Sequence, residues 1–229
     1  MFTLTGCLQA EESSDVKSTT DVTQIIESTE ENNIESIEKT DFESSSAKEG
    51  NNILIAYFTA AENSGVDASA SASYSNVNGE AKGRIRALAD MIQSETDGEL
   101  FSIQTSIVYP ADGRDLIDYA DQEQSDNARP ELISHIENLD SYDTIFIGYP
   151  NWWYDMPQAM YSFFDEYDFS GKTIIPFNSH NGSRFSDTIE TIQELEPDAN
   201  VITDGFTVNE RDVPDAVSDI AEWIDKLGY

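Results

Sequence analysis

The chain has 229 residues, room for one domain of ordinary size plus an extension, and its 38% hydrophobic content is enough for a core. Its 12 basic and 45 acidic residues give a net charge of −33, which opposes binding to nucleic acid or adsorption on an anionic membrane. One cysteine and two histidines offer no intrachain disulfide and no metal cluster of these residues, and no Asp-x-Asp-x-Asp-Gly loop is present, so we expect no metal site.

Residues 4–7, Leu-Thr-Gly-Cys, resemble the lipobox of bacterial lipoproteins, in which the signal peptide is cleaved before the cysteine and a diacylglyceryl group is attached to it. On this interpretation residues 1–7 are the remnant of a signal, and the protein lies outside the cytoplasm with its only membrane contact through the lipid on Cys7. Six residues precede Cys7, fewer than the charged start and the apolar stretch of about 7–15 residues that a signal peptide needs. Either residues are missing upstream, or the match is chance and the protein is cytoplasmic.

Residues 8–49 are rich in Ser, Thr, Glu and Asp and poor in apolar side chains. Such a segment buries too little apolar surface to offset the entropy of ordering it. The composition therefore predicts a disordered acidic tether, followed by a folded domain over residues 50–229.

The folded part alternates short apolar runs with amphipathic stretches. Five runs are predicted to be strands: Ile53–Phe58, Leu100–Ile103, Thr144–Tyr149, Thr173–Asn178 and Val201–Phe206. Helices are predicted over Gly79–Ser94, Asp115–Ala120, Pro130–Leu139, Met156–Tyr167, Phe185–Leu195 and Val213–Leu227. This alternation predicts an α/β fold with a doubly wound, five-stranded parallel sheet, for which 2-1-3-4-5 is one of two common strand orders.

Two adjacent tryptophans follow the third predicted strand, just after Gly148 and Pro150 end it. Ligands of open α/β sheets bind in the crevice outside the carboxyl ends of the strands. Trp152 and Trp153 at this place indicate a flat, π-rich ligand. The alternative is that one tryptophan covers the core and the other lies on the surface.

Three strand-end segments resemble the bacterial flavodoxin-like proteins: Tyr57-Phe58-Thr59, Gly148-Tyr149-Pro150-Asn151-Trp152-Trp153, and Pro176 through Ser183. The subgroup concerned carries a G-Y-P-x-W-W-x-x-M-P segment, which Met156 and Pro157 complete. The resemblance covers about Asn52 to Gly228. It implies the flavodoxin-like fold, FMN bound without a covalent link at the carboxyl edge of the sheet, and a role as an electron-transfer protein or flavin-dependent oxidoreductase.

The resemblance also implies where FMN binds. The phosphate loop would begin at Thr59, and Gly182 would let the backbone approach the ring because it lacks a Cβ. His180 is expected to frame the ring pocket or to face solvent rather than act as a base, and no catalytic residue is assigned. The full set implied to bind the cofactor is Thr59, Ala60, Ala61, Arg84, Pro150, Asn151, Trp152, Trp153, Tyr154, Ser179, His180, Asn181, Gly182 and Ser183.

The phosphate loop departs from the family pattern. Gly83-Arg84-Ile85 stands where some members have Gly-Asn-Thr, so a hydroxyl is lost at Ile85 while Arg84 would offset it with a charge-assisted bond. The preceding insert, residues 66–78, offers further hydroxyls, as does the loop before it. Those serines are Ser64, Ser69, Ser71 and Ser73. The alternative is that the insert is a mobile loop and Arg84 a solvated surface residue.

Two other functions stay open. A flavodoxin-fold lipoprotein that has lost FMN would act as a binding or interaction module, and the altered phosphate loop favours it. A quinone or azo-compound reductase using NAD(P)H would need a nicotinamide site, which the sequence does not locate. The electron donor, the electron acceptor and the oligomeric state are not assigned.

Overall fold

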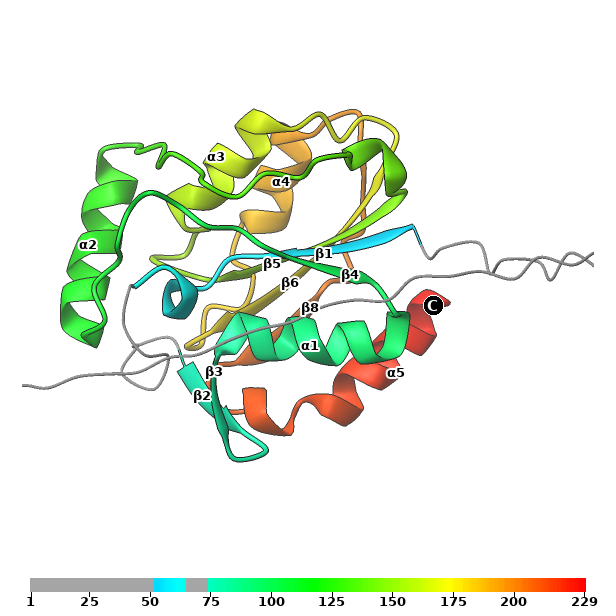
Figure 1. Cartoon of the computed structure of the whole chain (residues 1–229), viewed down its shortest axis with the longest axis horizontal. Coiled ribbons are helices and arrows are strands. Elements are labelled where there is room, and N and C mark those ends of the chain that lie inside the picture. Colours follow the sequence, from blue (N-terminus) through cyan, green and yellow to red (C-terminus); the bar gives the residue numbers. More distant parts are fainter. Residues whose placement is uncertain (1–51, 65–73) are drawn as a thin grey trace, which may run out of the picture. The chain divides into compact units, whose positions relative to one another are not determined.

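The computed structural model of the chain describes residues 52–64 and 74–229. They form three layers, with a parallel sheet between two layers of helices (Figure 1). The predictions for Cys7, for the tether over residues 8–49, and for Ser69, Ser71 and Ser73 lie outside the described residues. Among the helices of the described ranges, none combines the length and the apolar character that crossing a bilayer demands.

The sheet has the predicted topology. Its strand order is β4-β1-β5-β6, with β7 and β8 both paired to β6, and every pair is parallel. In the order of the predicted strands this is 2-1-3-4-5, so the doubly wound α/β fold is confirmed. The strands are β1 (Ile53–Tyr57), β4 (Glu99–Ser102), β5 (Thr144–Pro150), β6 (Thr173–His180), β7 (Asn200–Val201) and β8 (Phe206–Asn209).

The fifth predicted strand, Val201–Phe206, is broken in two. Strand β7 pairs with β6 as far as Ile174, and β8 resumes the pairing at Phe177. Pro176 lies in the gap, and a proline has no N–H to donate to a neighbouring strand. Gly205 fits against it because a Cβ there would stand 2.6 Å from the Pro176 carbonyl oxygen.

Two apolar cores lie on the two faces of the sheet. Strand β1 alternates between them: Leu54 and Ala56 pack on the side of α3 and α4, and Ile53 and Ile55 on the side of α1 and α5. Figure 1 shows these helix pairs above and below the sheet. The helices are α1 (Arg84–Thr96), α2 (Gly113–Ser125), α3 (Gln158–Glu166), α4 (Thr188–Leu195) and α5 (Val217–Leu227), with short 3-10 turns η1 (Ala60–Glu62), η3 (Leu139–Ser141) and η4 (Val213–Asp215).

The helix predicted over Gly79–Ser94 starts five residues later, and a hairpin precedes it. Strands β2 (Tyr74–Val77) and β3 (Glu80–Gly83) pair antiparallel, with Asn78 and Gly79 as the two-residue turn. Both turn residues have positive φ, 52° and 87°. Asn-Gly is the preferred sequence for such a turn. The sequence therefore contained a signal for this hairpin, which the prediction of a helix from Gly79 did not use.

The helix predicted over Pro130–Leu139 is wrong. This segment contains no α-helix, and its Leu132 forms an isolated antiparallel bridge with Thr105 after β4. On either side of the bridge, Ser106 N–H donates to the Glu131 carbonyl and Ile133 N–H to the Gln104 carbonyl. Leu132 is buried by this pairing. Tertiary pairing here overrides a weak helical pattern.

The other predicted helices are present with shifted ends. Asp115–Ala120 lies inside the longer α2, and the segment predicted from Phe185 turns helical only at Thr188. Pro157 immediately precedes the first helical residue of α3, Gln158.

Candidate functional site

A crevice lies at the carboxyl ends of β1, β5 and β6. It contains two cavities of about 310 and 60 Å³ that share lining residues, and a shallower groove of about 500 Å³ runs beside them. Most of the residues implied to bind the cofactor line one of these spaces, and Ala60 and Ala61 do not. Those two alanines are buried in η1. The lining residues among the predicted set are Thr59, Arg84, Pro150, Asn151, Trp152, Trp153, Tyr154, Ser179, His180, Asn181, Gly182 and Ser183.

Thr59 forms one end of the smaller cavity. Its side chain is 1% exposed, and within the described residues its hydroxyl Oγ1 has no hydrogen-bond partner. Gly83, which precedes the first residue of α1, lies against it, since a Cβ at Gly83 would be 2.6 Å from Thr59 Oγ1. A buried hydroxyl and the positive end of a helix therefore meet at this cavity, the combination that binds phosphate groups.

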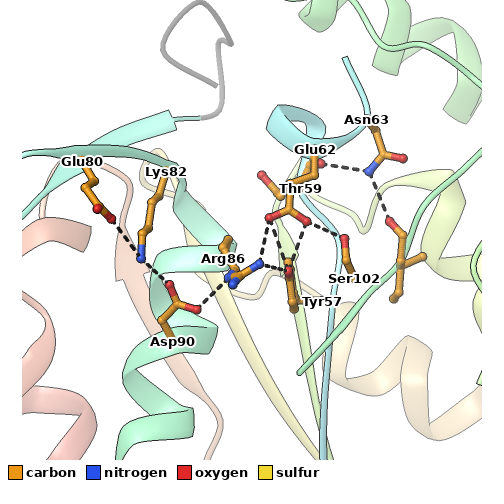
Figure 2. A network of polar contacts seen from close by, with 10 residues as sticks. Tyr57, Thr59, Glu62, Asn63, Glu80, Lys82, Arg86, Asp90 and Ser102 are labelled. Carbon is orange, nitrogen blue, oxygen red and sulfur yellow. Dashed lines mark hydrogen bonds and ion pairs between the residues drawn. The ribbon is translucent and has the colours of Figure 1, made fainter. Parts of the chain in front are cut away.

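A polar network fixes the backbone around Thr59 (Figure 2). Asn63 Nδ2 donates to the Thr59 carbonyl at 3.0 Å, and Glu62 accepts from the hydroxyls of Tyr57 and Ser102. Burial first, then the charge of Glu62, raises the pKa of Tyr57 to about 12, so it stays a donor. The network continues through Arg86 to α1. These contacts hold the Thr59 backbone in place without any ligand.

Arg84 is the first residue of α1 and lines both cavities. Its Nη1 donates to Glu210 Oε2 at 3.1 Å, and its Nε donates to Ser75 Oγ at 3.3 Å. Ile85 beside it is buried in the core, and its side chain has no hydroxyl. Ser64 is also buried, and its hydroxyl donates to the Ala61 carbonyl. Arg84 is therefore at the cavity, but its charge already has a partner.

Sequence reasoning missed Glu210. Its strand was predicted to end at Phe206, which put Glu210 in the following loop with no assigned place. The strand in fact continues to Asn209, so Glu210 stands at the carboxyl edge of the sheet. A longer apolar alternation through Val208 was the signal that would have located it.

The tryptophan loop is a tight turn. Trp152 and Asp155 exchange backbone hydrogen bonds, and Trp153 and Tyr154 between them have φ of 51° and 67°. Bulky residues seldom adopt positive φ, a strain on the order of 1 kcal/mol or more each. The turn makes the two tryptophans diverge.

Trp152 points inward and Trp153 outward. The Trp152 ring packs edge-on against Phe58 and at a tilt against Tyr109, with ring centroids 5.7 and 5.9 Å apart. Trp153 is 46% exposed, lines the larger cavity, and donates from Nε1 to the Ile117 carbonyl at 3.0 Å. Trp152 thus supports the loop, while Trp153 is exposed and lines the crevice.

Asn151 connects the tryptophan loop after β5 to the loop after β6. Its backbone N–H donates to the Ser179 carbonyl at 2.8 Å, and its Nδ2 donates to the carbonyls of Arg184 and Phe185. Its Oδ1 is buried and has no partner in the described part of the chain. A buried acceptor left unpaired is costly and calls for a donor.

The loop after β6 fixes the tautomer of His180. Gly182 N–H donates to His180 Nδ1 at 2.8 Å, so a neutral His180 carries its proton on Nε2. Burial, followed by the charge of Arg184, lowers the pKa of His180 below its usual value. The loop turns at Gly182, whose φ of 106° favours glycine.

A buried acid lies behind Trp152. Glu123 on α2 is 6% exposed and accepts a hydrogen bond from the hydroxyl of Tyr109, the ring that packs on Trp152. Burial raises the pKa of Glu123 to about 7. A titratable group was not expected here, because the helix that holds Glu123 was predicted to end at Ala120.

Comparison with known proteins matches the chain to one family. The family model described as flavodoxin covers residues 71–227. No curated protein matches the sequence at a significant level.

Solved structures share this fold. A protein of Bacteroides uniformis ATCC 8492 assigned as a flavoprotein has 29% identity and a TM-score of 0.59, over 77% of this chain and 99% of its own. A similarly assigned protein of Bacteroides eggerthii DSM 20697 has 26% identity and a TM-score of 0.54, over 74% and 97%. A flavoprotein of Lactobacillus acidophilus NCFM in complex with FMN has 22% identity and a TM-score of 0.51, over 72% and 97%.

Proposed function

The chain belongs to the flavodoxin family, and we propose that it binds FMN in the crevice at the carboxyl edge of the sheet and acts as an electron carrier or flavin-dependent oxidoreductase. Family membership supports FMN as the cofactor. Bound FMN supplies one- and two-electron chemistry, whereas the protein contributes binding, orientation and electrostatics.

One observation carries the proposal. The orphaned hydroxyl of Thr59 lies beside Gly83 at the start of α1, and the exposed ring of Trp153 lines the adjoining cavity at the same edge. Thr59 and the first backbone N–H groups of α1 would hold the phosphate, since an anion accepts hydrogen bonds from both. Trp153 would stack on the ring, as aromatic faces do at about 4.5–7 Å between centroids.

The remaining loop residues would orient the ring. The buried Oδ1 of Asn151 is an acceptor that suits an N–H donor of the ligand, and the Nε2–H of His180 is a donor. Trp152 and Tyr109 exclude water from behind the tryptophan loop. The negative charge of the chain, −33, disfavours adding electrons to a bound flavin and so lowers its reduction potential.

A spectroscopic experiment tests this function. Purified full-length protein is mixed with FMN, freed of unbound flavin, and reduced under nitrogen first with NADPH and then with dithionite. An electron carrier keeps a yellow flavin spectrum that bleaches with dithionite only, whereas an NAD(P)H-dependent reductase bleaches with NADPH. A protein that retains no flavin contradicts both.

The second candidate is a flavin-free interaction module of the same fold. The observation that favours it is the engagement of Arg84 by Glu210, together with the absence of a hydroxyl at Ile85. Both changes reduce the attraction of this end of the crevice for phosphate. The same experiment separates the two functions, because the module retains no flavin.

We also propose that Cys7 is lipidated and anchors the domain outside the cytoplasm. Support comes from the residues Leu4-Thr5-Gly6-Cys7 and the polar composition of residues 8–49. Expressed behind a restored signal region in a host with the lipoprotein pathway, the wild type should fractionate with membranes. Cys7→Ala should be released or left unprocessed, and identical fractionation of the two would refute the proposal.

A further inference from the structure

The ion pair between Arg84 and Glu210 occupies the phosphate end of the crevice. Both side chains line both cavities, and the smaller cavity also contains Thr59. Arg84 and Glu210 are 23% and 31% exposed, so the pair is partly shielded from water and salt. The cavity implied to receive a dianion therefore already contains an anionic side chain.

We propose that this pair is a latch that FMN opens: the phosphate takes the place of Glu210 on the Arg84 guanidinium, and Glu210 is the residue that sets how much FMN is preferred over flavins without phosphate. The proposal rests on the proposed function. It concerns a part of this chain that departs from the family pattern, because Gly83-Arg84-Ile85 stands where some members have Gly-Asn-Thr.

The anchoring of Arg84 makes an exchange of partners possible. Its backbone belongs to the first turn of α1, its Nε donates to Ser75 on the hairpin strand β2, and its Nη1 donates to Glu210. A guanidinium binds a phosphate best through two parallel N–H groups. Bidentate binding at the Nη end needs the donor that Glu210 now uses.

The position of Glu210 makes it a repulsive element as well. Its backbone N–H donates to the His180 carbonyl at 2.8 Å, which pins the residue between the ends of β6 and β8. The side chain can swing away, but the backbone cannot leave the crevice. A carboxylate held near a phosphate dianion weakens its binding, and the effect is larger at low ionic strength.

The test compares two ligands that differ only in the phosphate. FMN and riboflavin are titrated into full-length wild type and into Glu210→Gln, with binding followed by quenching of flavin fluorescence. Glu137→Gln is the matched control, since it removes the same charge from an exposed residue shortly before the amino end of β5. Circular dichroism verifies the fold, and Glu210→Ala repeats the test without the amide.

We expect Glu210→Gln to bind FMN about tenfold more tightly than wild type, as removal of one close like charge predicts. Riboflavin affinity and the Glu137→Gln variant should be unchanged, and the gain should shrink at high salt. Arg84→Gln should weaken the binding of FMN and leave the binding of riboflavin unchanged. The wild type must itself bind FMN, because FMN binding by Glu210→Gln alone would mean that the phosphate cannot displace Glu210 from Arg84, which would contradict the latch.

Each of the following results overturns the latch. Equal FMN affinities of wild type, Glu210→Gln and Glu210→Ala, with FMN bound, sink the latch and leave the proposed function standing. An equal gain for FMN and riboflavin shows that Glu210 does not act on the phosphate. Failure of every variant to bind either flavin overturns the latch and the proposed function together.

Discussion

Replacing Thr59 with valine should stabilise the free protein while weakening its cofactor binding. Valine has nearly the shape of threonine, so the substitution removes the hydroxyl without opening a space. Oγ1 is buried and unpartnered in the described structure, and a hydroxyl buried without a hydrogen bond costs about 1–3 kcal/mol. We expect Thr59→Val to raise the free energy of unfolding by about 1 kcal/mol, or the melting temperature by about 2–4 °C.

The effect on FMN should have the opposite sign. A hydrogen bond from a hydroxyl to a charged phosphate contributes about 1.5–3 kcal/mol, so losing it lowers the affinity by about 10- to 100-fold. Riboflavin, which lacks the phosphate, should bind Thr59→Val as it binds wild type. Thermal unfolding without ligand and fluorescence titration with both flavins measure the two effects.

Ser162 provides a matched control. Its hydroxyl is likewise buried and unpartnered among the described residues, but it lies on α3 at a separate groove with Arg129 and His135. Ser162→Ala should also stabilise the protein, and it should leave FMN binding unchanged. If Thr59→Val destabilises the free protein, or lowers riboflavin and FMN affinity equally, the reasoning about an orphaned phosphate ligand is refuted.

Four further substitutions test the crevice and the residues that support it. Trp153→Ala should lower FMN affinity several-fold through loss of about 1 kcal/mol of stacking and barely change stability. Trp152→Ala should instead lower the free energy of unfolding by about 2 kcal/mol or more. FMN titration and chemical denaturation of both variants measure these effects, and reversed effects would contradict the assigned roles. Because burial raises the pKa of Glu123 to about 7, the folded protein binds more protons than the unfolded chain and wild type loses stability as pH rises through about 4.5 to 7. Denaturation should therefore show Glu123→Gln gaining on the order of 1 kcal/mol over wild type between pH 5 and 8, and parallel profiles would contradict this. Gly83→Ala places a Cβ 2.6 Å from Thr59 Oγ1 and should destabilise the protein by about 1–3 kcal/mol, with an unchanged melting temperature as the contrary result.

The sheet could be predicted from the sequence because each central strand is buried on both faces. Continuous apolar runs such as Ile53–Tyr57 have few other interpretations, and the alternation with helices leaves few topologies. The hairpin turn at Asn78-Gly79 was also readable from its sequence, but the prediction placed Asn78 in the insert and started a helix at Gly79.

Long-range pairing was the part that the sequence could not show. Nothing local in Glu131 to Ile133 reveals that their backbone groups bind those of residues 104–106. The break between β7 and β8 likewise depends on Pro176 of the neighbouring strand, which a pattern within residues 201–206 does not contain.

The same distinction applies to the site. Loops that follow strands can be placed at the ligand edge from the order of elements, and this located Thr59 and Asn151. The partner of a charged residue is set by where another strand ends, and the match of Arg84 with Glu210 spans 126 residues. A buried acid such as Glu123 is recognisable only when the covering rings are known.

We propose that FMN binds at this crevice through its phosphate as well as its ring. Titration of FMN and riboflavin into purified full-length protein, followed by loss of flavin fluorescence, tests it most directly. We expect saturable binding of one FMN per chain with a dissociation constant in the micromolar range or below, and weaker binding of riboflavin. Absence of FMN quenching at tens of micromolar flavin, or equal affinity for the two flavins, would contradict it.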